Sequence, residues 1–367
     1  MARLDGVSKQ TAQKIEKLAE SVVRAVKGGK NPFVEIPIRS LANVNFNPRR
    51  RLIELGTQRQ KRYFFNVSMA KKFMQTFLVS DACKELIESG KTTSIRDLYY
   101  ITKHTIGDTK QNTFEEQDES DPIIEDLEVA LDALREELHL SASRKGSMVG
   151  PITIRDTGDT IDLRRMGSGG WAVPSIVEEN VIEFVRHEAK YILLIEKDAV
   201  WTRFNEDKFW KRERCIILQG GGQPPRGVRR LVQRLHSELK LPVYVLVDND
   251  PWGFYIYSVM KQGSINLAYE SMRMAVPDAR FVGLSSFDKD KYKLPVNVAI
   301  KMDDGDVSRA KQMLAYPWFQ AKQWQREIQE MVRSGLKFEL EALSRRGISF
   351  ITEEYLPKKL KDKDWLE

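Results

Sequence analysis

Two short apolar runs in the second half of the chain each end at acidic residues. The first run covers residues 191–195 and is followed by Glu196, and the second covers residues 243–247 and is followed by Asp248. Short runs that are rich in β-branched residues and closed by polar residues are typical of buried strands in a parallel sheet. We therefore predict that both acidic positions lie just beyond the carboxyl ends of strands.

The segments around these two runs predict a regular alternation of strands and helices. Further strand-like runs cover residues 215–218 and 280–284, and helical patterns cover residues 198–213, 228–239 and 252–261. Strands that alternate with helices in this way form a parallel sheet with right-handed crossovers. The second half of the chain is thus predicted to be an α/β domain with a parallel sheet.

The acidic residues after the strands are candidate metal ligands. Glu196, Asp248 and Asp250 all follow strand ends, and open α/β sheets bind their ligands beyond these ends. Three converging carboxylates repel one another without a counter-charge, so we predict that they hold a hard divalent cation, Mg²⁺. The alternative is that these residues only cap the helices that follow them.

The first half of the chain is predicted to be mainly helical. An amphipathic helix over residues 8–27 either packs on its own domain or docks another subunit. Three helices follow, of which the second begins at Ser94 and the third covers residues 123–138, and the pattern then predicts a β-hairpin over residues 147–154. Three helices followed by a hairpin describe a winged helix-turn-helix domain, which docks in a groove of DNA.

Charge and composition narrow the function classes. The chain has 367 residues, with 59 Lys or Arg against 52 Asp or Glu, and the net charge of +7 suits a polyanionic partner without proving one. The two cysteines, Cys83 and Cys215, lack metal-ligand spacing and indicate a reducing intracellular compartment. No apolar run reaches membrane-spanning length, and Met1 is not followed by a signal-peptide pattern. The glycine run at residues 220–222 lacks the lysine of a nucleotide-binding loop.

Three motifs together resemble one known family. Residues 193–198 and 247–253 resemble the Toprim domain of DNA topoisomerase VI A subunits, and residues 96–100 resemble the active-site motif of the same subunits. This family also includes the meiotic double-strand-break proteins. The resemblance implies an α+β multidomain protein, in which a CAP-like winged-helix DNA-binding domain is followed by an α/β Toprim domain with a parallel sheet. It divides the chain into an N-terminal extension for subunit contact, the winged-helix domain, a linker, and the Toprim domain with C-terminal helices, at residues 1–63, 64–155, 156–180 and 181–367.

The resemblance also assigns site residues. In the active-site motif the second aromatic position carries the nucleophile, which makes Tyr100 the predicted catalytic residue, and Arg96, one helical turn earlier, would hold the scissile phosphate. Without the motif, an aromatic pair on a helix is more often part of a core. We interpret His104 as an ordinary surface residue rather than a base or a phosphate contact. The acidic cluster at residues 303–306 is interpreted as a solvated loop rather than a weak cation site.

The implied function is that of the DNA-cleaving and rejoining subunit of an ATP-dependent type IIB topoisomerase. Attack by Tyr100 on double-stranded DNA would leave a 5′-phosphotyrosyl link, and a homodimer would cut both strands with a stagger. The resemblance implies Mg²⁺ at Glu196, Asp248 and Asp250. It implies that a separate B subunit of the GHKL class uses the ATP, and that an A2B2 heterotetramer relaxes or decatenates DNA. It further implies a cytoplasmic, nucleoid-associated location in an archaeal-type cell, without a membrane.

Three alternative functions stay open at this point. The first is a meiotic-type protein that makes double-strand breaks without strand passage, the second is a Toprim nuclease that uses water, and the third is a non-catalytic DNA-binding scaffold. The compact chain favours the resealing enzyme over the meiotic type. A water-using nuclease would explain the acidic residues but not Arg96 and Tyr100, and a scaffold would need none of them.

Overall fold

The computed structural model describes residues 6–367. Contacts among these residues define two compact units. Unit 1 extends to Asn43 and resumes from Leu55 to Ser143, whereas unit 2 comprises Val44–Glu54 and Arg144–Glu367.

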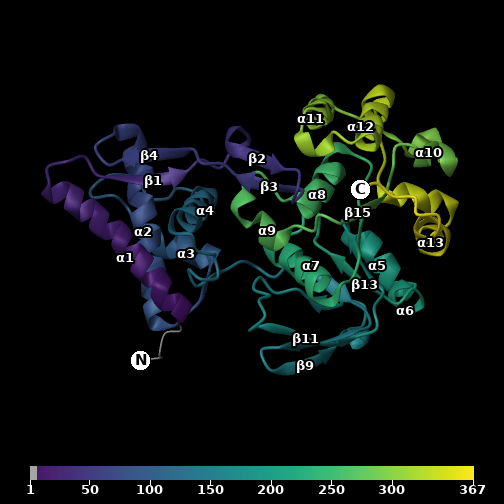
Figure 1. The fold of residues 1–367 in the computed structure, drawn as a ribbon, viewed down its shortest axis with the longest axis horizontal. Coiled ribbons are helices and arrows are strands. Elements are labelled where there is room, and N and C mark those ends of the chain that lie inside the picture. The colour runs from purple at the N-terminus through teal and green to yellow at the C-terminus, as the bar shows by residue number, and fades with distance from the viewer. Residues whose placement is uncertain (1–5) are drawn as a thin grey trace. The chain divides into compact units, whose positions relative to one another are not determined.

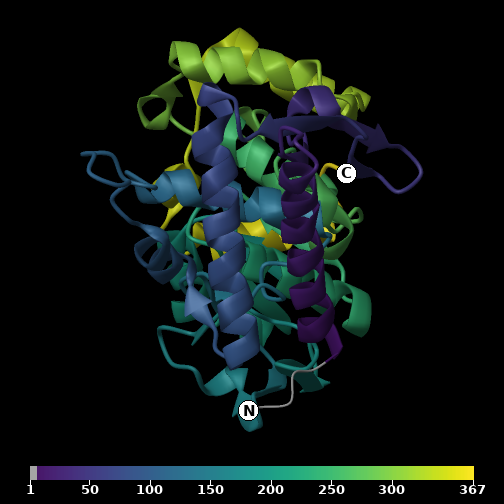
Figure 2. The same cartoon turned by 90° about the vertical axis from the view of Figure 1, so that its left-hand side faces the viewer.

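Unit 1 is mainly helical, as predicted. Its elements are α1 (Gly6–Lys27), β1 (Phe33–Pro37), the 3₁₀ helix η1 (Leu41–Asn43), β4 (Arg59–Tyr63), α2 (Val67–Ser89), β5 (Thr93–Ser94), α3 (Ile95–Thr102), η2 (Gln117–Glu119), α4 (Ser120–Leu131) and β6 (Leu140–Ser141). Helix α1 runs beside α2 (Figure 1 and Figure 2) and buries Ala12 and Ile15 in the core of the unit. The helix predicted over residues 8–27 is therefore confirmed.

Helix α3, which carries the predicted nucleophile, has clear local determinants. Ser94 caps the helix, because its Oγ accepts a hydrogen bond from the backbone N–H of Asp97 at 3.0 Å. Leu98 and Tyr99 form the buried face of α3 and join the core made by α2 and α4. The cap therefore fixes where the helix begins, and the buried pair fixes which face points outward.

Unit 2 contains the predicted α/β domain and further strands and helices. Its elements are β2 (Val44–Asn47), β3 (Leu52–Leu55, of which the last residue belongs to unit 1), β7 (Ser147–Val149), β8 (Ile152–Asp156), β9 (Asp159–Asp162), η3 (Leu163–Arg165), β10 (Trp171–Ala172), β11 (Ile182–His187), β12 (Tyr191–Ile195), α5 (Asp198–Glu206), α6 (Phe209–Arg212), β13 (Cys215–Gln219), α7 (Arg226–Leu239), β14 (Val243–Leu246), α8 (Pro251–Gln262), η4 (Ala268–Glu270), α9 (Ser271–Met274), β15 (Arg280–Gly283), α10 (Asp288–Lys291), η5 (Val296–Val298), β16 (Ile300–Lys301), α11 (Asp304–Leu314), η6 (Pro317–Phe319), α12 (Lys322–Ser334), β17 (Leu336–Lys337), η7 (Leu340–Arg346), the π-helix η8 (Ile351–Tyr355) and α13 (Leu356–Lys361).

The central sheet of unit 2 has the strand order β10-β7-β13-β12-β14-β15. Strands β13, β12, β14 and β15 run parallel to one another, which confirms the predicted parallel sheet. Every residue of β12, β13 and β14 is buried, as the continuous apolar runs require. Since Ile195 at the end of β12 pairs with Leu246 at the end of β14, the residues that follow these two strands emerge at the same edge of the sheet.

The predicted β-hairpin over residues 147–154 is wrong. Strand β7 pairs with β13 and β10 in the central sheet, whereas β8 pairs with β11 and β9 in a separate sheet. Two short runs around a turn resemble a hairpin locally, but here β7 pairs with strands that are distant in the sequence, and β8 forms its hairpin with the following strand β9. Unit 1 consequently ends at Ser143 instead of residue 155, and the segment 156–180 that was expected to be a linker contains β9 and β10.

Candidate active site

The strand ends of unit 2 bring two of the predicted metal ligands together. Glu196 directly follows β12, and Asp248 lies two residues beyond β14. The Oε2 atom of Glu196 accepts a hydrogen bond from the backbone N–H of Asp248 at 3.0 Å. Asp248 is only 4% exposed. The two carboxylates are thus held at one edge of the sheet by the backbone itself.

Both carboxylate oxygens of Asp248 already have partners. Oδ1 accepts a hydrogen bond from the backbone N–H of Leu340 at 2.8 Å. Oδ2 forms an ion pair with the Nζ atom of Lys197 at 2.9 Å. A buried carboxylate needs such partners, because leaving its charge without hydrogen bonds would cost on the order of several kcal/mol. Asp248 is therefore fixed in position.

Asp250, the third predicted ligand, also caps a helix. Its Oδ1 accepts a hydrogen bond from the backbone N–H of Gly253 at 2.6 Å at the start of α8. The alternative interpretation of the acidic residues thus holds for Asp250, while Glu196 bonds to a strand end. Gly253 is required here, because a Cβ atom would lie 2.3 Å from the carbonyl oxygen of Asp248. The first turn of α8 can therefore approach the strand end closely.

Burial and mutual repulsion disfavour the charged forms of these carboxylates. Burial, followed by repulsion from Asp248, raises the pKa of Glu196 to about 7. Burial raises the pKa of Asp248 to about 6, although the hydrogen bond from Lys197 opposes this shift. Burial also raises the pKa of Asp250. A divalent cation would stabilise the charged forms of such carboxylates, because they lie close together and are poorly solvated.

The donor atoms suit a magnesium ion, but the present arrangement does not hold one as it stands. Carboxylate oxygens are the ligands that Mg²⁺ prefers, and burial, with a smaller part from mutual repulsion, raises the pKa values of Glu196 and Asp248, a cost that a bound cation would lower. Among residues 6–367, no group of three or more His, Cys, Asp or Glu side chains is placed to hold a metal ion together. The ion pair with Lys197 occupies the Asp248 oxygen that is free of backbone contacts.

The structure separates the two neighbouring tyrosines of α3. Tyr99 is 6% exposed, and its hydroxyl donates to the carbonyl oxygen of Glu115 at 2.9 Å and accepts from the Nζ atom of Lys103 at 2.7 Å. Tyr100 is 60% exposed, and its hydroxyl makes no hydrogen bond within the described part of the chain. Only the Tyr100 hydroxyl is thus free to approach a ligand.

Arg96 and Tyr100 share the exposed face of α3. They are four residues apart, which places them one turn apart on the same side of a helix, and both side chains are exposed. The guanidinium of Arg96 forms no ion pair within residues 6–367. His104 lies beyond the end of α3 and is exposed, and its imidazole has no hydrogen-bond partner in that same range. Arg96 and Tyr100 thus form a pair that can bind a phosphate, while the contacts of His104 are those of its backbone with Thr113.

Two features of the acidic edge were not predicted from the sequence. One is Lys197, whose position directly after Glu196 in the sequence already places it at the strand end. The segment Phe338–Glu341, which contacts Asp248 and Lys197, lies about ninety residues further along the chain. Its approach depends on the pairing of Asn249 with Phe338, which no local pattern indicates.

The second acidic cluster is a helix cap. Asp303 and Asp306 form a capping box at the start of α11, in which each side chain accepts a backbone N–H of the other residue. Asp306 also pairs with Lys337 at 2.6 Å. The prediction of a solvated loop is therefore wrong, because the cluster forms the start of α11 and Asp306 is buried.

Both cysteines lie in the part of the chain that the structure describes. Cys83 and Cys215 are both free and buried, and burial raises the pKa of the Cys83 thiol to about 12. Within residues 6–367, no helix combines the length and apolar character needed to cross a bilayer.

Three family models match successive parts of the chain. Residues 71–140 match the model described as type IIB DNA topoisomerase, residues 145–188 match the all-beta domain in DNA topoisomerase VI alpha subunit, and residues 191–360 match the Toprim domain of the topoisomerase 6 A subunit and Spo11. The first match contains α3 and Tyr100, and the third contains all three acidic ligand candidates.

Similar proteins extend over nearly the whole chain. Over 360 residues the chain is 45% identical to the A subunit of type 2 DNA topoisomerase 6 from Pyrococcus horikoshii, covering 95% of this chain and 94% of that protein. It is 42% identical over 371 residues to the protein of the same name from Hyperthermus butylicus, covering 97% and 94%. It is 36% identical over 363 residues to the A3 subunit of DNA topoisomerase 6 from Oryza sativa subsp. indica, covering 99% and 80%.

Proposed function

The chain belongs to the family of type 2 DNA topoisomerase 6 A subunits, and we propose that it cuts duplex DNA by attack of the Tyr100 phenolic oxygen on a backbone phosphate. As a member of this family it is the DNA-cleaving subunit of a type IIB topoisomerase. The attack breaks the bond between phosphorus and the 3′ oxygen, links Tyr100 to the 5′ phosphate and leaves a 3′ hydroxyl. Because one phosphodiester replaces another, the reverse reaction reseals the strand without a further energy source.

The observation that carries this proposal is the unequal setting of the two tyrosines. The Tyr99 hydroxyl is held by Glu115 and Lys103, so its attack on DNA would require both hydrogen bonds to break. The exposed Tyr100 hydroxyl has no such constraint. We therefore assign the nucleophile to Tyr100 and a packing role to Tyr99.

Arg96 and the carboxylates would supply the charge that the reaction needs. Arg96, one turn from Tyr100 and without an ion pair in the described residues, would bind the non-bridging oxygens of the scissile phosphate as negative charge develops. Glu196, Asp248 and Asp250 would hold Mg²⁺, which when bound polarises a phosphate and stabilises a leaving 3′ oxygen. The proton of the phenol would pass to solvent, and the leaving oxygen would take a proton in turn.

We propose that two copies of the chain act together on one duplex. Cutting both strands requires two nucleophiles, and a two-fold dimer matches the pseudo-two-fold symmetry of duplex DNA. In this arrangement Tyr100 of one copy works with the acidic edge of the other copy. A double-strand break then requires the dimer, and the isolated copy is inactive.

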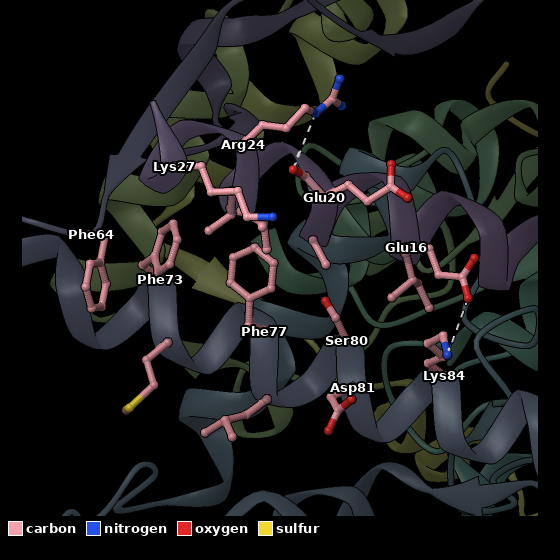
Figure 3. Close-up of a pocket in the computed structure, with 16 residues that line it drawn as sticks. Glu16, Glu20, Arg24, Lys27, Phe64, Phe73, Phe77, Ser80, Asp81 and Lys84 are labelled. Carbon is pink, nitrogen blue, oxygen red and sulfur yellow. Dashed lines mark hydrogen bonds and ion pairs between the residues drawn. The ribbon is translucent and has the colours of Figure 1, made fainter. Parts of the chain in front are cut away.

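The partner that drives strand passage would bind a groove between α1 and α2. This groove has a volume of 940 Å³, and Figure 3 shows Phe64, Phe73 and Phe77 along its α2 side. Val23 on the α1 side is 49% exposed. The buried Ile15 shows that the start of α1 packs on its own unit, so docking falls to the second half of the helix. We propose that an apolar helix of the ATP-hydrolysing B subunit fills the groove in an A2B2 complex.

A substitution in the groove tests this docking site. Val23→Glu should abolish co-purification with the B subunit, whereas the control Val7→Glu, outside the second half of α1, should not.

Two finer expectations remain predictions. The helices α2 to α4 would dock DNA as a winged-helix domain, but without the hairpin that was expected at residues 147–154, since those strands belong to unit 2. A cytoplasmic, nucleoid-associated location follows from action on DNA. The meiotic-type alternative is not favoured, because the relatives named above carry the topoisomerase name over nearly the full length of this chain.

The test is the capture of covalent adducts. The protein is incubated with supercoiled DNA, Mg²⁺, ATP and a B subunit, and the reaction is quenched with detergent to trap DNA that is attached to protein. Tyr100→Phe is expected to lose the adduct, and Tyr99→Phe is the matched control that keeps it. Cleavage without an adduct in the Tyr100→Phe protein would instead identify a nuclease that uses water, and DNA binding without cleavage in every protein would identify a scaffold.

A further inference from the structure

Lys197 is shared among three carboxylates at the acidic edge. Its Nζ atom lies 2.9 Å from Oδ2 of Asp248, 3.0 Å from Oε2 of Glu341 and 3.4 Å from Oε1 of Glu339. The Lys197 side chain is 25% exposed, whereas the Asp248 side chain is 6% exposed. The ammonium group therefore stands between a buried carboxylate and two carboxylates that face solvent.

A cation that binds Asp248 must compete with Lys197 for one particular oxygen. Oδ1 of Asp248 accepts a hydrogen bond from the backbone N–H of Leu340 at 2.8 Å, whereas the partner of Oδ2 is a flexible side chain, that of Lys197. Mg²⁺ binds oxygen at about 2.0–2.1 Å, and an ammonium group that stays in contact with the same oxygen would be repelled strongly at that range. Lys197 and the ion therefore repel each other when both are bound to Oδ2.

The two outer glutamates are held in place beside this oxygen. They flank Leu340, whose backbone bonds to Asp248. The residue before them, Phe338, exchanges two backbone hydrogen bonds with Asn249, at 2.8 and 3.0 Å. The segment that carries Glu339 and Glu341 is thus tied to the strand end that carries Asp248. These glutamates offer a second place for the ammonium group within the reach of a flexible lysine side chain.

We propose that Lys197 is an exchangeable counter-ion of the metal site, which pairs with Asp248, Glu339 and Glu341 in the metal-free protein and releases Asp248 to stay with the two glutamates when a divalent cation binds. The inference rests on the proposed function, since it takes Asp248 as a metal ligand. Lys197 neutralises the buried carboxylate until the cation arrives. It then stays next to the site, paired with carboxylates that do not bind the ion.

The proposal is tested by magnesium binding, measured by isothermal titration calorimetry on the full-length chain without DNA. Lys197→Met removes the charge and keeps the length of the side chain, so Mg²⁺ should bind more tightly, by about tenfold, because a competing and repelling cation is gone. Glu339→Gln combined with Glu341→Gln should weaken Mg²⁺ binding several-fold, since Lys197 then has only Asp248 to pair with. Glu179→Gln, at an exposed glutamate of unit 2 without an ion pair among residues 6–367, is the matched control and should leave the affinity unchanged.

A triple variant separates exchange from a general effect of charge. The two glutamates also attract a cation directly, and removing them would weaken binding whatever Lys197 does. If they act through Lys197, adding both glutamine substitutions to Lys197→Met should cause no further loss of affinity. The same several-fold loss in the triple variant would overturn the role of the glutamates.

Further outcomes would overturn the proposal and separate it from the proposed function. Weaker Mg²⁺ binding by a folded Lys197→Met protein, checked by circular dichroism, would identify Lys197 as a fixed support of Asp248 and end the exchange account. If Lys197→Met does not fold, failure of the two exposed glutamine substitutions to weaken binding would still contradict the proposal. An absence of Mg²⁺ binding by the unaltered protein would overturn the exchange together with the metal assignment, and would leave a Tyr100-linked adduct unaffected.

Discussion

The nucleophile in unit 1 and the acidic edge in unit 2 are built in opposite ways. Tyr100 is 60% exposed on a two-turn helix, and its hydroxyl has no hydrogen-bond partner in the described part of the chain. Asp248 is 4% exposed, and both of its carboxylate oxygens are bonded. The Tyr100 hydroxyl is thus exposed to solvent without a hydrogen bond from the described residues. The Asp248 carboxylate is instead fixed by its partners before any ligand binds.

The nucleophile and the acidic edge meet different physical demands. A nucleophile that must reach a phosphate of an incoming duplex profits from exposure, and the charge that activates it has to come from elsewhere. Carboxylates that gather at one strand edge repel one another, and burial strengthens the repulsion. They must therefore be tied to the backbone and to Lys197 in advance.

Mixing of two inactive proteins tests whether the two halves work across the dimer, and its effect is the largest we expect. Tyr100→Phe and Glu196→Gln should each reduce double-strand cleavage by about 10³-fold or more. A heterodimer of the two should regain one working site and make single-strand nicks, because its intact Tyr100 meets the intact acidic edge of the other copy. The measurement is the conversion of supercoiled to nicked circles.

The control for this experiment places both substitutions in one chain. Paired with an unaltered chain, the double variant should make no nicks if the halves work across the dimer. Nicks from this pair, and none from the mixed single variants, would show that Tyr100 and Glu196 of the same copy cooperate, and the proposed arrangement would be wrong.

Substitution of Arg96 tests the other exposed residue of α3 and should have the next largest effect. Arg96→Gln removes the charge that would bind the scissile phosphate, so the rate of adduct formation should fall by about 10- to 100-fold while the affinity for DNA changes little. Arg96→Lys keeps the charge but loses the bidentate geometry of the guanidinium, so its rate of adduct formation should lie between those of the unaltered protein and Arg96→Gln. The rate is measured by quenched-flow trapping of the adduct at saturating DNA. Equal rates for all three proteins would limit Arg96 to a surface role.

Asp250 is both the cap of α8 and a predicted metal ligand, and two substitutions can separate these roles. Asp250→Asn keeps an oxygen for the backbone N–H of Gly253 but loses the charge, so cleavage should fall with little change in stability. Asp250→Ala loses both and should lower the free energy of unfolding by about 1 kcal/mol. Urea denaturation of both proteins in EDTA separates the two roles. A stability loss in Asp250→Asn as large as in Asp250→Ala would mean that charge, not capping, holds α8.

Lys261 shows what burial does to a charge whose ammonium group donates to a backbone carbonyl, that of Ala279, and we expect no effect of Lys261 on cleavage. Burial, followed by repulsion from Arg51, lowers its pKa from 10.5 to about 8. Because the unfolded chain then binds more protons between these two values, stability should rise as the pH rises from 8 to 10.5. In Lys261→Met this contribution of about 2–3 kcal/mol should be absent. The measurement is the difference between the two urea-unfolding profiles over this pH range, and identical slopes would show that Lys261 is solvated.

The acidic edge was largely predictable from the sequence because its determinants are local. Buried parallel strands leave continuous apolar runs, and the residue that ends each run must lie at the carboxyl edge, so Glu196 and Asp248 could be placed together without any structure. The exposed face shared by Arg96 and Tyr100 followed in the same way from helical spacing, once Ser94 was taken as the cap. In each case the prediction depends only on residues that lie within a few positions of one another in the sequence.

The features that were missed depend on contacts between distant segments. Strands β7 and β8 looked like a hairpin because they are short and close in sequence, but β7 pairs with β13 and β8 with β11. The approach of Leu340 and its two flanking glutamates to Asp248 depends on the pairing of Asn249 with Phe338. No periodicity records such a pairing, and so the role of Lys197 emerged only from the structure.

The central claim is that Tyr100 is the residue that becomes joined to DNA. Its most direct test is mass spectrometry of the trapped adduct after nuclease and trypsin digestion. Cleavage after Arg96 and Lys103 yields one peptide that contains both Tyr99 and Tyr100, so fragment ions distinguish them within the same molecule. We predict a 5′-linked nucleotide on Tyr100. A nucleotide on Tyr99 or on any other residue would contradict the account.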